Sequence, residues 1–189
     1  MRLFVAVWPS SDVRAALESL PRPDHPSVRW TPPHQWHVTL RFLGDVDGTT
    51  LPAVADALRG AAQHWSPRLA ELGPSTARLG RGVLVVPVAG LRDLGRGAAD
   101  ATSRFGQPPP ERPFRGHVTL ARGRGRSSVP AHLAGQPVGI SWQVGELAVV
   151  RSRLGPGVPR YDVVATIELS GGPTSRSAPP PRVSAAPAR

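Results

Sequence analysis

One tetrapeptide, His-Val-Thr-Leu, occurs twice in the chain, at residues 37–40 and again at residues 117–120, 80 positions later. Successive side chains of an extended strand point to opposite faces. The His and Thr of each copy therefore share one face, and the Val and Leu share the other. Each copy is typical of a strand with an apolar side against a core and a polar side facing a cleft. Two such strands side by side would bring two imidazoles and two hydroxyls together.

These four polar residues predict acid–base chemistry on a phosphate. A histidine titrates near neutral pH, so one imidazole can donate a proton while a second accepts one. Threonine hydroxyls can donate hydrogen bonds to phosphate oxygens, where they lower the barrier as charge develops. A strained cyclic phosphate diester suits this arrangement. A lone His on a strand is more often a satisfied polar residue, but the repetition of the motif favours a functional pair.

Metal binding is the main chemical alternative for the two histidines. Zinc requires at least a third protein ligand, and neither an H-E-x-x-H cluster nor any cysteine occurs in the chain. The four remaining histidines fall in predicted turns or at the ends of predicted elements, and we expect them at the surface: His25, His34, His64 and His132. We therefore expect no metal and no other cofactor.

The charge of the chain agrees with a phosphate-bearing partner. The net charge is +10, and all 23 basic residues are arginines. The many prolines, alanines and glycines indicate the codon bias of a GC-rich genome, so arginine could simply replace lysine. A basic surface nevertheless attracts phosphates and raises the rate of encounter with nucleic acid.

The sequence predicts a cytoplasmic protein, with monomer as the default state. No apolar run approaches the roughly 20 residues needed to cross a bilayer, so we expect no membrane partner. Residues 1–9 are too short and too quickly interrupted by proline for a secretory signal. The lack of cysteine excludes a disulfide framework and fits a reducing compartment.

Apolar patterns predict alternating strands and helices within one domain over residues 1–170. We expect helices at 12–20, 51–64 and 91–105, and strands at 2–8, 28–30, 36–43, 82–88, 141–152 and 161–169, with a second motif strand from about 117. From 171 to 189 the chain is rich in Pro, Ser and Ala and has no aromatic residue, so we expect a disordered tail. Removing the tail's three arginines from the net charge of +10 leaves +7 on the domain.

The duplicated motif resembles that of the two-histidine (2H) phosphoesterase superfamily. More closely, the chain is similar to the RNA 2′,3′-cyclic phosphodiesterases, historically called the 2′-5′ RNA ligase family. Three stretches carry this likeness, which covers about residues 1–169: R-L-F-V-A-V at 2–7, H-V-T-L-R-F-L-G at 37–44, and R-P-F-R-G-H-V-T-L-A-R at 112–122.

The resemblance implies a bilobal α+β fold with an internal pseudo-two-fold. Two antiparallel β-sheets would be flanked by helices, and a central cleft between the lobes would hold both motifs. It implies metal-independent hydrolysis of RNA 2′,3′-cyclic phosphate ends to 2′-phosphates, with weak reverse 2′-5′ ligation in some members. The partner would be RNA with such an end or a small cyclic nucleotide. Carried onto this chain, His37 is the proton donor, His117 is the proton acceptor, and Thr39 and Thr119 bind the phosphate.

Two arginines near the motifs are further candidates for binding the substrate. Arg122 follows the second motif, and its guanidinium suits phosphate as a bidentate donor. Strict alternation would put Arg122 opposite to the face of His117, so the strand must end or bulge there. Arg41 shares the predicted face of His37 and could contact the RNA backbone or lie at the rim.

Three aromatic residues could contact a base. Phe42 and Phe114 could stack on one, although core packing explains Phe42 better, and Tyr161 could line the rim of the cleft. An alternative function is a non-catalytic module that binds RNA ends and retains the pocket. The two intact pairs of His and Thr favour the enzyme, and the matching flanks make an arginine-rich protein of unrelated fold a poor third explanation.

Overall fold

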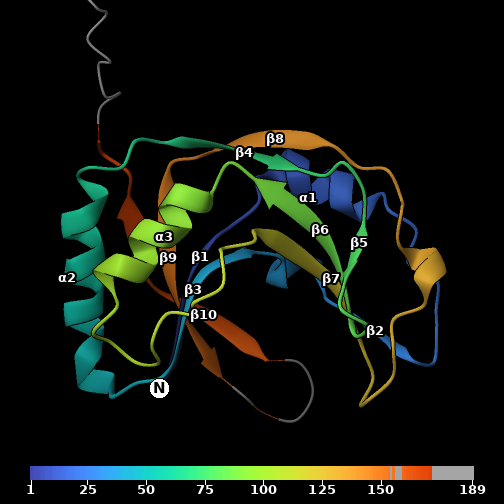
Figure 1. Ribbon diagram of the computed structural model, residues 1–189, viewed down its shortest axis with the longest axis horizontal. Helices are drawn as coiled ribbons and strands as arrows, with labels where there is room; N and C mark the ends of the chain where they lie inside the picture. The colour runs from blue at the N-terminus through green and yellow to red at the C-terminus, as the bar shows by residue number, and fades with distance from the viewer. Residues whose placement is uncertain (154, 156–158, 172–189) are drawn as a thin grey trace, which may run out of the picture.

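The computed structural model describes residues 1–153, 155 and 159–171 (Figure 1). From residue 172 onward the predicted disordered tail lies outside the described residues. Most of the Gly-Pro-Gly segment at 155–157, which joins the last two predicted strands, lies outside them as well.

The described strands form one strongly curled sheet in which every ladder is antiparallel. The strands are β1 (Arg2–Val7), β2 (Val28–Trp30), β3 (Val38–Asp45), β4 (Arg68–Leu72), β5 (Ala77–Leu79), β6 (Val83–Ala89), β7 (His117–Gly123), β8 (Ile140–Val144), β9 (Glu146–Arg153) and β10 (Arg160–Glu168). Their order is β10-β9-β1-β3-β7-β6-β4-β8, with β2 added to β7 and β5 added to β6.

All three predicted helices are present. They are α1 (Ser11–Glu18), α2 (Leu51–Ala62) and α3 (Arg92–Ala101), and short 3-10 turns occur at Pro33–Gln35, Gly48–Thr50 and Ala131–Leu133. The hydroxyl of Ser10 caps α1 by accepting a hydrogen bond from the N–H of Val13. The predicted third helix ends four residues too late, because the Thr102 hydroxyl donates to the Ala98 carbonyl and the chain then turns.

The α+β class is confirmed, but the two expected sheets are one. β3 and β7 join at a single register pair, Val38 opposite Val118, and both valines are fully buried. We call the two sides of this junction the arms: β10-β9-β1-β3 is the first arm and β7-β6-β4-β8 is the second. Each arm carries one copy of the His-Val-Thr-Leu motif at its inner edge.

The helices pack on the face of the sheet that holds the main core. α2 lies against β10 and α3, α3 lies against β3, and α1 lies against β8 (Figure 1). The opposite face of the first arm carries a smaller apolar cluster of Phe4, Ala6, Ala148 and Val150, against which Trp8, Phe42 and Tyr161 pack. Among the described helices, none is long and apolar enough to span a bilayer.

A bulge interrupts β3 directly after the first motif. Thr39 is paired with Ala6 on β1, and Arg41 is paired with Val5, so Leu40 has no partner on that strand. An extra residue in one strand reverses the alternation of side chains beyond it.

β7 bulges at the equivalent position. Thr119 is paired with Val85 on β6, and Ala121 is paired with Leu84, so Leu120 has no partner on that strand. The last residue of each motif is therefore a bulge, and the two arms share this irregularity as well as the motif itself.

Candidate active site

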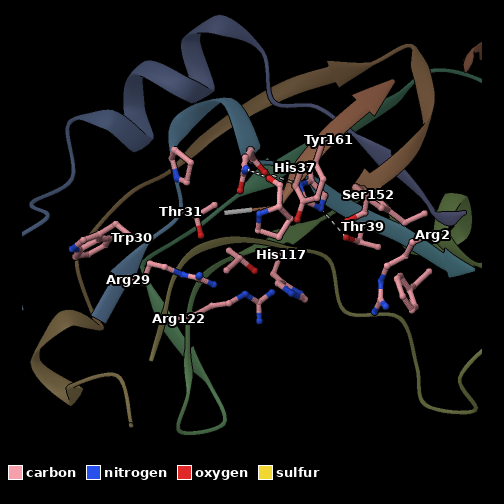
Figure 2. Close-up of a pocket in the computed structure, with 16 residues that line it drawn as sticks. Arg2, Arg29, Trp30, Thr31, His37, Thr39, His117, Arg122, Ser152 and Tyr161 are labelled. Atoms are coloured by element: carbon pink, nitrogen blue, oxygen red, sulfur yellow. Dashed lines mark hydrogen bonds between the residues drawn. The ribbon is translucent and has the colours of Figure 1, made fainter. Parts of the chain in front are cut away.

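A pocket of about 350 Å³ lies over the junction between the two arms, and Figure 2 shows it from close range. Both motif histidines and both motif threonines line it, and they come from β3 with the residue before it and from β7. Further lining residues come from β1, β2, β9 and β10. The structure therefore brings His37, Thr39, His117 and Thr119 to one cavity.

The two imidazoles are oriented in the same way. The Nδ1 atom of His37 lies 2.7 Å from the carbonyl oxygen of Gln35, and the Nδ1 atom of His117 lies 2.8 Å from that of Arg115. Each carbonyl can only accept, so each Nδ1 carries the proton of this bond. A hydrogen bond at one ring nitrogen fixes the role of the other. Nε2 is therefore the unprotonated nitrogen of each ring in its neutral form.

His37 is half-buried among aromatic rings. Its ring centroid lies 4.9 Å from that of Phe4, 5.3 Å from that of Tyr161 and 5.6 Å from that of Trp8. Its Nε2 atom is 3.1 Å from the hydroxyl oxygen of Thr39, which donates to it when the ring is neutral. This packing holds the ring in one orientation.

The surroundings of His37 favour its neutral form. Burial lowers the pKa of His37 most strongly, and repulsion from His117 and Arg122 lowers it further. The hydrogen bond to the Gln35 carbonyl acts in the opposite direction but is outweighed. An ordinary histidine has a pKa of about 6.5, so His37 is mainly neutral at pH 7 in the free protein.

Arg122 reaches the pocket because of the bulge at Leu120. The reversed alternation puts Arg122 on the same face as His117, and Arg122 lines the pocket. On β2, Arg29 is the register partner of Arg122. Figure 2 shows the two guanidinium groups side by side at one end of the pocket.

A third guanidinium, that of Arg2, lies at the other end of the pocket. It is 4.9 Å from the ring centroid of Phe42 and 3.8 Å from the carboxylate of Asp45. No aspartate or glutamate occurs among the residues that line this pocket in the described part of the chain. The cavity is therefore strongly cationic and suited to an anion.

Arg41 does not face the pocket, although alternation along the strand predicted that it shares the face of His37. The bulge at Leu40 turns it to the core, where it is only 3% exposed. Its guanidinium donates to the carbonyls of Phe42, Gln107 and Pro108, and thereby ties the segment after α3 to β3. Burial lowers the pKa of Arg41.

The three aromatic residues predicted to contact a base do not all lie in the pocket. Phe42 takes the pocket face after the bulge and lines the cavity, together with Tyr161. Phe114 does not line it and instead packs against α3, where its ring would be 2.7 Å from a Cβ at Gly95. The position of Phe114 therefore does not support the suggestion that it stacks on a base.

Arg2, Arg29 and Trp30 are among the lining residues that the sequence analysis did not predict. Arg2 shares a strand face with Phe4, a signal that alternation could have used. Arg29 and Trp30 sit in a short extended piece, and only the register of β2 on β7 reveals that they reach the site. Within residues 1–153, 155 and 159–171, no group of three or more His, Asp or Glu side chains is arranged to hold a metal ion.

Comparison with known proteins identifies the family. The family model of LigT-like phosphoesterases matches residues 7–78. An RNA 2′,3′-cyclic phosphodiesterase of Thermus thermophilus is 36% identical, over 90% of this chain and 91% of that protein. The chain belongs to the LigT-like phosphoesterase family. The resemblance predicted from the motifs is thereby confirmed. A relative from Geobacillus stearothermophilus, also named RNA 2′,3′-cyclic phosphodiesterase, is 27% identical over 92% of this chain and 59% of its own length.

Solved structures share the LigT-like fold. The protein TT0787 of Thermus thermophilus superposes with a TM-score of 0.76 at 31% identity, over 90% of this chain and 99% of that chain. LigT of E. coli in complex with 3′-AMP has a TM-score of 0.69 at 24% identity, over 89% of this chain and 98% of that chain. The second likeness concerns the fold alone.

Proposed function

We propose that the chain hydrolyses RNA 2′,3′-cyclic phosphate ends to 2′-phosphates without a metal ion. The observation that carries this proposal is the matched pair of imidazoles, each with Nδ1 held by the carbonyl two residues earlier and with Nε2 as the reactive atom of one cationic pocket. The name of the 36% identical relative supports the same activity.

The proposed reaction uses one histidine as a base and the other as an acid. His117 accepts a proton at Nε2 from the attacking water while the oxygen of that water bonds to phosphorus. The bond between phosphorus and O3′ breaks, and His37 donates the proton that O3′ requires. The phosphate remains on O2′, and exchange with solvent restores both imidazoles. Thr39, Thr119 and Arg122 donate to the non-bridging oxygens as charge develops.

The lowered pKa of His37 bears on which histidine is the acid. A donor must be protonated, and the free protein holds His37 mainly neutral. A bound phosphodiester anion would oppose the repulsion from His117 and Arg122 and so raise the pKa of His37 again. The opposite assignment, with neutral His37 as the base, draws support from this same pKa shift.

We propose that the same site also catalyses weak 2′-5′ ligation. If the 5′-hydroxyl of a second RNA takes the place of water, its oxygen bonds to phosphorus while the bond to O3′ breaks. The product is a 2′-5′ phosphodiester, and the two proton transfers are unchanged. Water is far more concentrated than RNA ends, so hydrolysis dominates.

The decisive experiment is a product assay with adenosine 2′,3′-cyclic phosphate in the presence of EDTA. We expect adenosine 2′-phosphate and no 3′-isomer, separated by chromatography. His37→Ala and His117→Ala should each lower kcat by about 10²- to 10⁴-fold, the usual contribution of one acid or base. His64→Ala, which changes an exposed histidine outside the pocket, is the control. Full activity in either motif variant would overturn the mechanism.

A sulfur atom in place of O3′ separates the two roles. A thiolate leaves without a proton, so this substrate does not need the acid. Activity on it should recover in the variant that lacks the acid and remain low in the variant that lacks the base. Recovery in His37→Ala supports His37 as the donor, and recovery in His117→Ala reverses the assignment.

The non-catalytic alternative predicts a different result. A module that only binds RNA ends would bind the cyclic nucleotide in a salt-dependent manner and release no product under any of these conditions. Turnover by the wild-type protein would exclude it.

A further inference from the structure

A second cavity, of about 480 Å³, opens beside the active-site pocket. Arg29 and Trp30 line both cavities, so these two side chains form the wall between them. Beyond the wall the cavity is lined by His25 and Arg124, with the carboxylate of Asp24 as its one acidic group in the described part of the chain. The reaction proposed above does not use this space.

Cationic side chains continue from the first cavity into the second. Arg29 faces Arg122 across the ladder between β2 and β7, and like charges in register on neighbouring strands repel each other. In the described residues neither side chain forms an ion pair with a carboxylate. Arg124 follows β7, and its Nε donates to the Val28 carbonyl at 3.2 Å. This bond leaves the two terminal nitrogens of Arg124 for an anion.

Trp30 presents a fixed aromatic surface at the wall. Its indole N–H donates to the Pro23 carbonyl at 3.1 Å, which holds the ring in position, and the side chain is only partly buried. Bases of single-stranded RNA stack on such rings regardless of their identity. An ordered ring loses little entropy when a base stacks on it.

His25 adds a hydrogen-bond donor to the second cavity. The backbone N–H of Ser27 donates to its Nδ1 atom at 3.2 Å. Nδ1 is therefore unprotonated, and the proton of the neutral ring is on Nε2. Nε2 can donate to a phosphate or to the acceptor edge of a base.

The composition of the first pocket sets the direction of the RNA. Phe42 lies beside the Arg2 guanidinium, and Tyr161 and Arg2 have the same register partner, Ser152, so both rings lie toward the Arg2 end, where an aromatic environment suits the terminal base. The rest of the RNA then leaves past Arg29 and Trp30. We infer that the second cavity binds the nucleotide on the 5′ side of the cyclic phosphate, and that the enzyme prefers RNA ends of two or more nucleotides to a mononucleotide. This inference rests on the proposed function and names its substrate class.

The test compares kcat/KM for the dinucleotide ApA with a 2′,3′-cyclic phosphate end and for adenosine 2′,3′-cyclic phosphate. We expect a preference for the dinucleotide of about tenfold or more, because stacking of one base contributes a factor of this size. Trp30→Ala and Arg124→Ala should each lower this ratio several-fold, and Trp30→Phe should largely preserve it. Arg68→Ala, at an exposed arginine on β4, should leave both kcat/KM values unchanged.

Salt dependence gives a second readout. The additional phosphate of the dinucleotide should make its kcat/KM fall more steeply with salt than that of the mononucleotide. Arg124→Ala should remove this difference in slope, and Arg124→Lys should restore part of it.

Two results would overturn the inference: a wild-type ratio near one, or a ratio that neither Trp30→Ala nor Arg124→Ala lowers. Both leave hydrolysis itself intact. Failure of the proposed function looks different, because neither substrate is then turned over. In that case the same variants are compared by equilibrium binding of ApA with a 2′-phosphate end and of 2′-AMP, and equal affinities would again overturn the second site.

Discussion

Val38 and Val118 face each other in the single register pair between β3 and β7, at the centre of the sheet. The strands are antiparallel, so the same register continued by one residue in either direction would set His37 opposite Thr119 and Thr39 opposite His117. The pair of valines therefore marks the local two-fold of the site. It also makes the separation of the imidazoles depend on how the arms meet.

Val38→Ala should disturb both stability and turnover. The side chain is fully buried, so its truncation should cost about 2 kcal/mol in the free energy of unfolding. Because the junction sets the spacing of the histidines, kcat should fall further than the loss of folded protein explains. Val163→Ala, at a half-exposed valine of β10, is the matched control. A Val38→Ala protein with unchanged kcat per folded molecule would show that the junction does not position the site.

The lowered pKa of His37 predicts a loss of stability in mild acid. In the unfolded chain His37 binds a proton as the pH falls through about 6.5, whereas the folded protein resists protonation until a lower pH. Its contribution to stability is therefore complete above pH 6.5 and declines as the pH falls toward the folded pKa. Urea unfolding at several pH values should show a weaker decline in His37→Gln. NMR titration should show the pKa of His37 rising in Arg122→Gln, and an unchanged pKa would contradict the proposed repulsion.

Arg41 should matter for stability and not for substrate binding. Arg41→Met leaves three backbone carbonyls without their donor, at a cost of about 1–3 kcal/mol. KM should stay close to the wild-type value in the protein that folds. Arg59→Met, on the exposed face of α2, should change neither quantity. A large rise in KM with normal stability would instead show that Arg41 takes part in substrate binding.

Substitution of Phe42 should affect substrate binding, and substitution of Phe114 should affect stability. Phe42→Ala should raise KM several-fold, because its ring borders the pocket. Phe114→Ala should lower the unfolding free energy by about 3 kcal/mol or less, because its half-buried ring packs on α3, and should change KM little. Steady-state kinetics and urea unfolding of both variants test this contrast, and the opposite pattern would refute the assignment of the two rings.

The motif threonines should act on the bound phosphate. Valine matches the shape of threonine but cannot donate, so Thr39→Val and Thr119→Val should each lower kcat/KM by about 10- to 100-fold, as expected for a hydrogen bond to a charged group. Thr166→Val, at an exposed threonine of β10, is the control. Values within about twofold of the wild type in both motif variants would remove the threonines from the mechanism.

The sequence was sufficient for the parts of the site that depend on local pattern. Alternation along a strand placed His37 beside Thr39, and the second motif followed the same rule. Alternation failed to predict the faces of Arg41 and Phe42, because a bulge depends on how the partner strand pairs and leaves no clear signal in the bulged strand. Arg29 was missed for a related reason, since the register between β2 and β7 is a tertiary property. The single sheet, likewise, depends on one pair of valines from distant parts of the chain.

The twin bulges at Leu40 and Leu120 give the two arms an equivalent position just beyond them, and the chain fills it with a phenyl ring in one arm and a guanidinium in the other. Up to that point the two motif copies are identical in sequence. Beyond it they differ. The difference between Phe42 and Arg122 therefore gives the pocket two chemically distinct sides, an aromatic one suited to a nucleobase and a cationic one suited to phosphate, although its backbone frame is nearly symmetric.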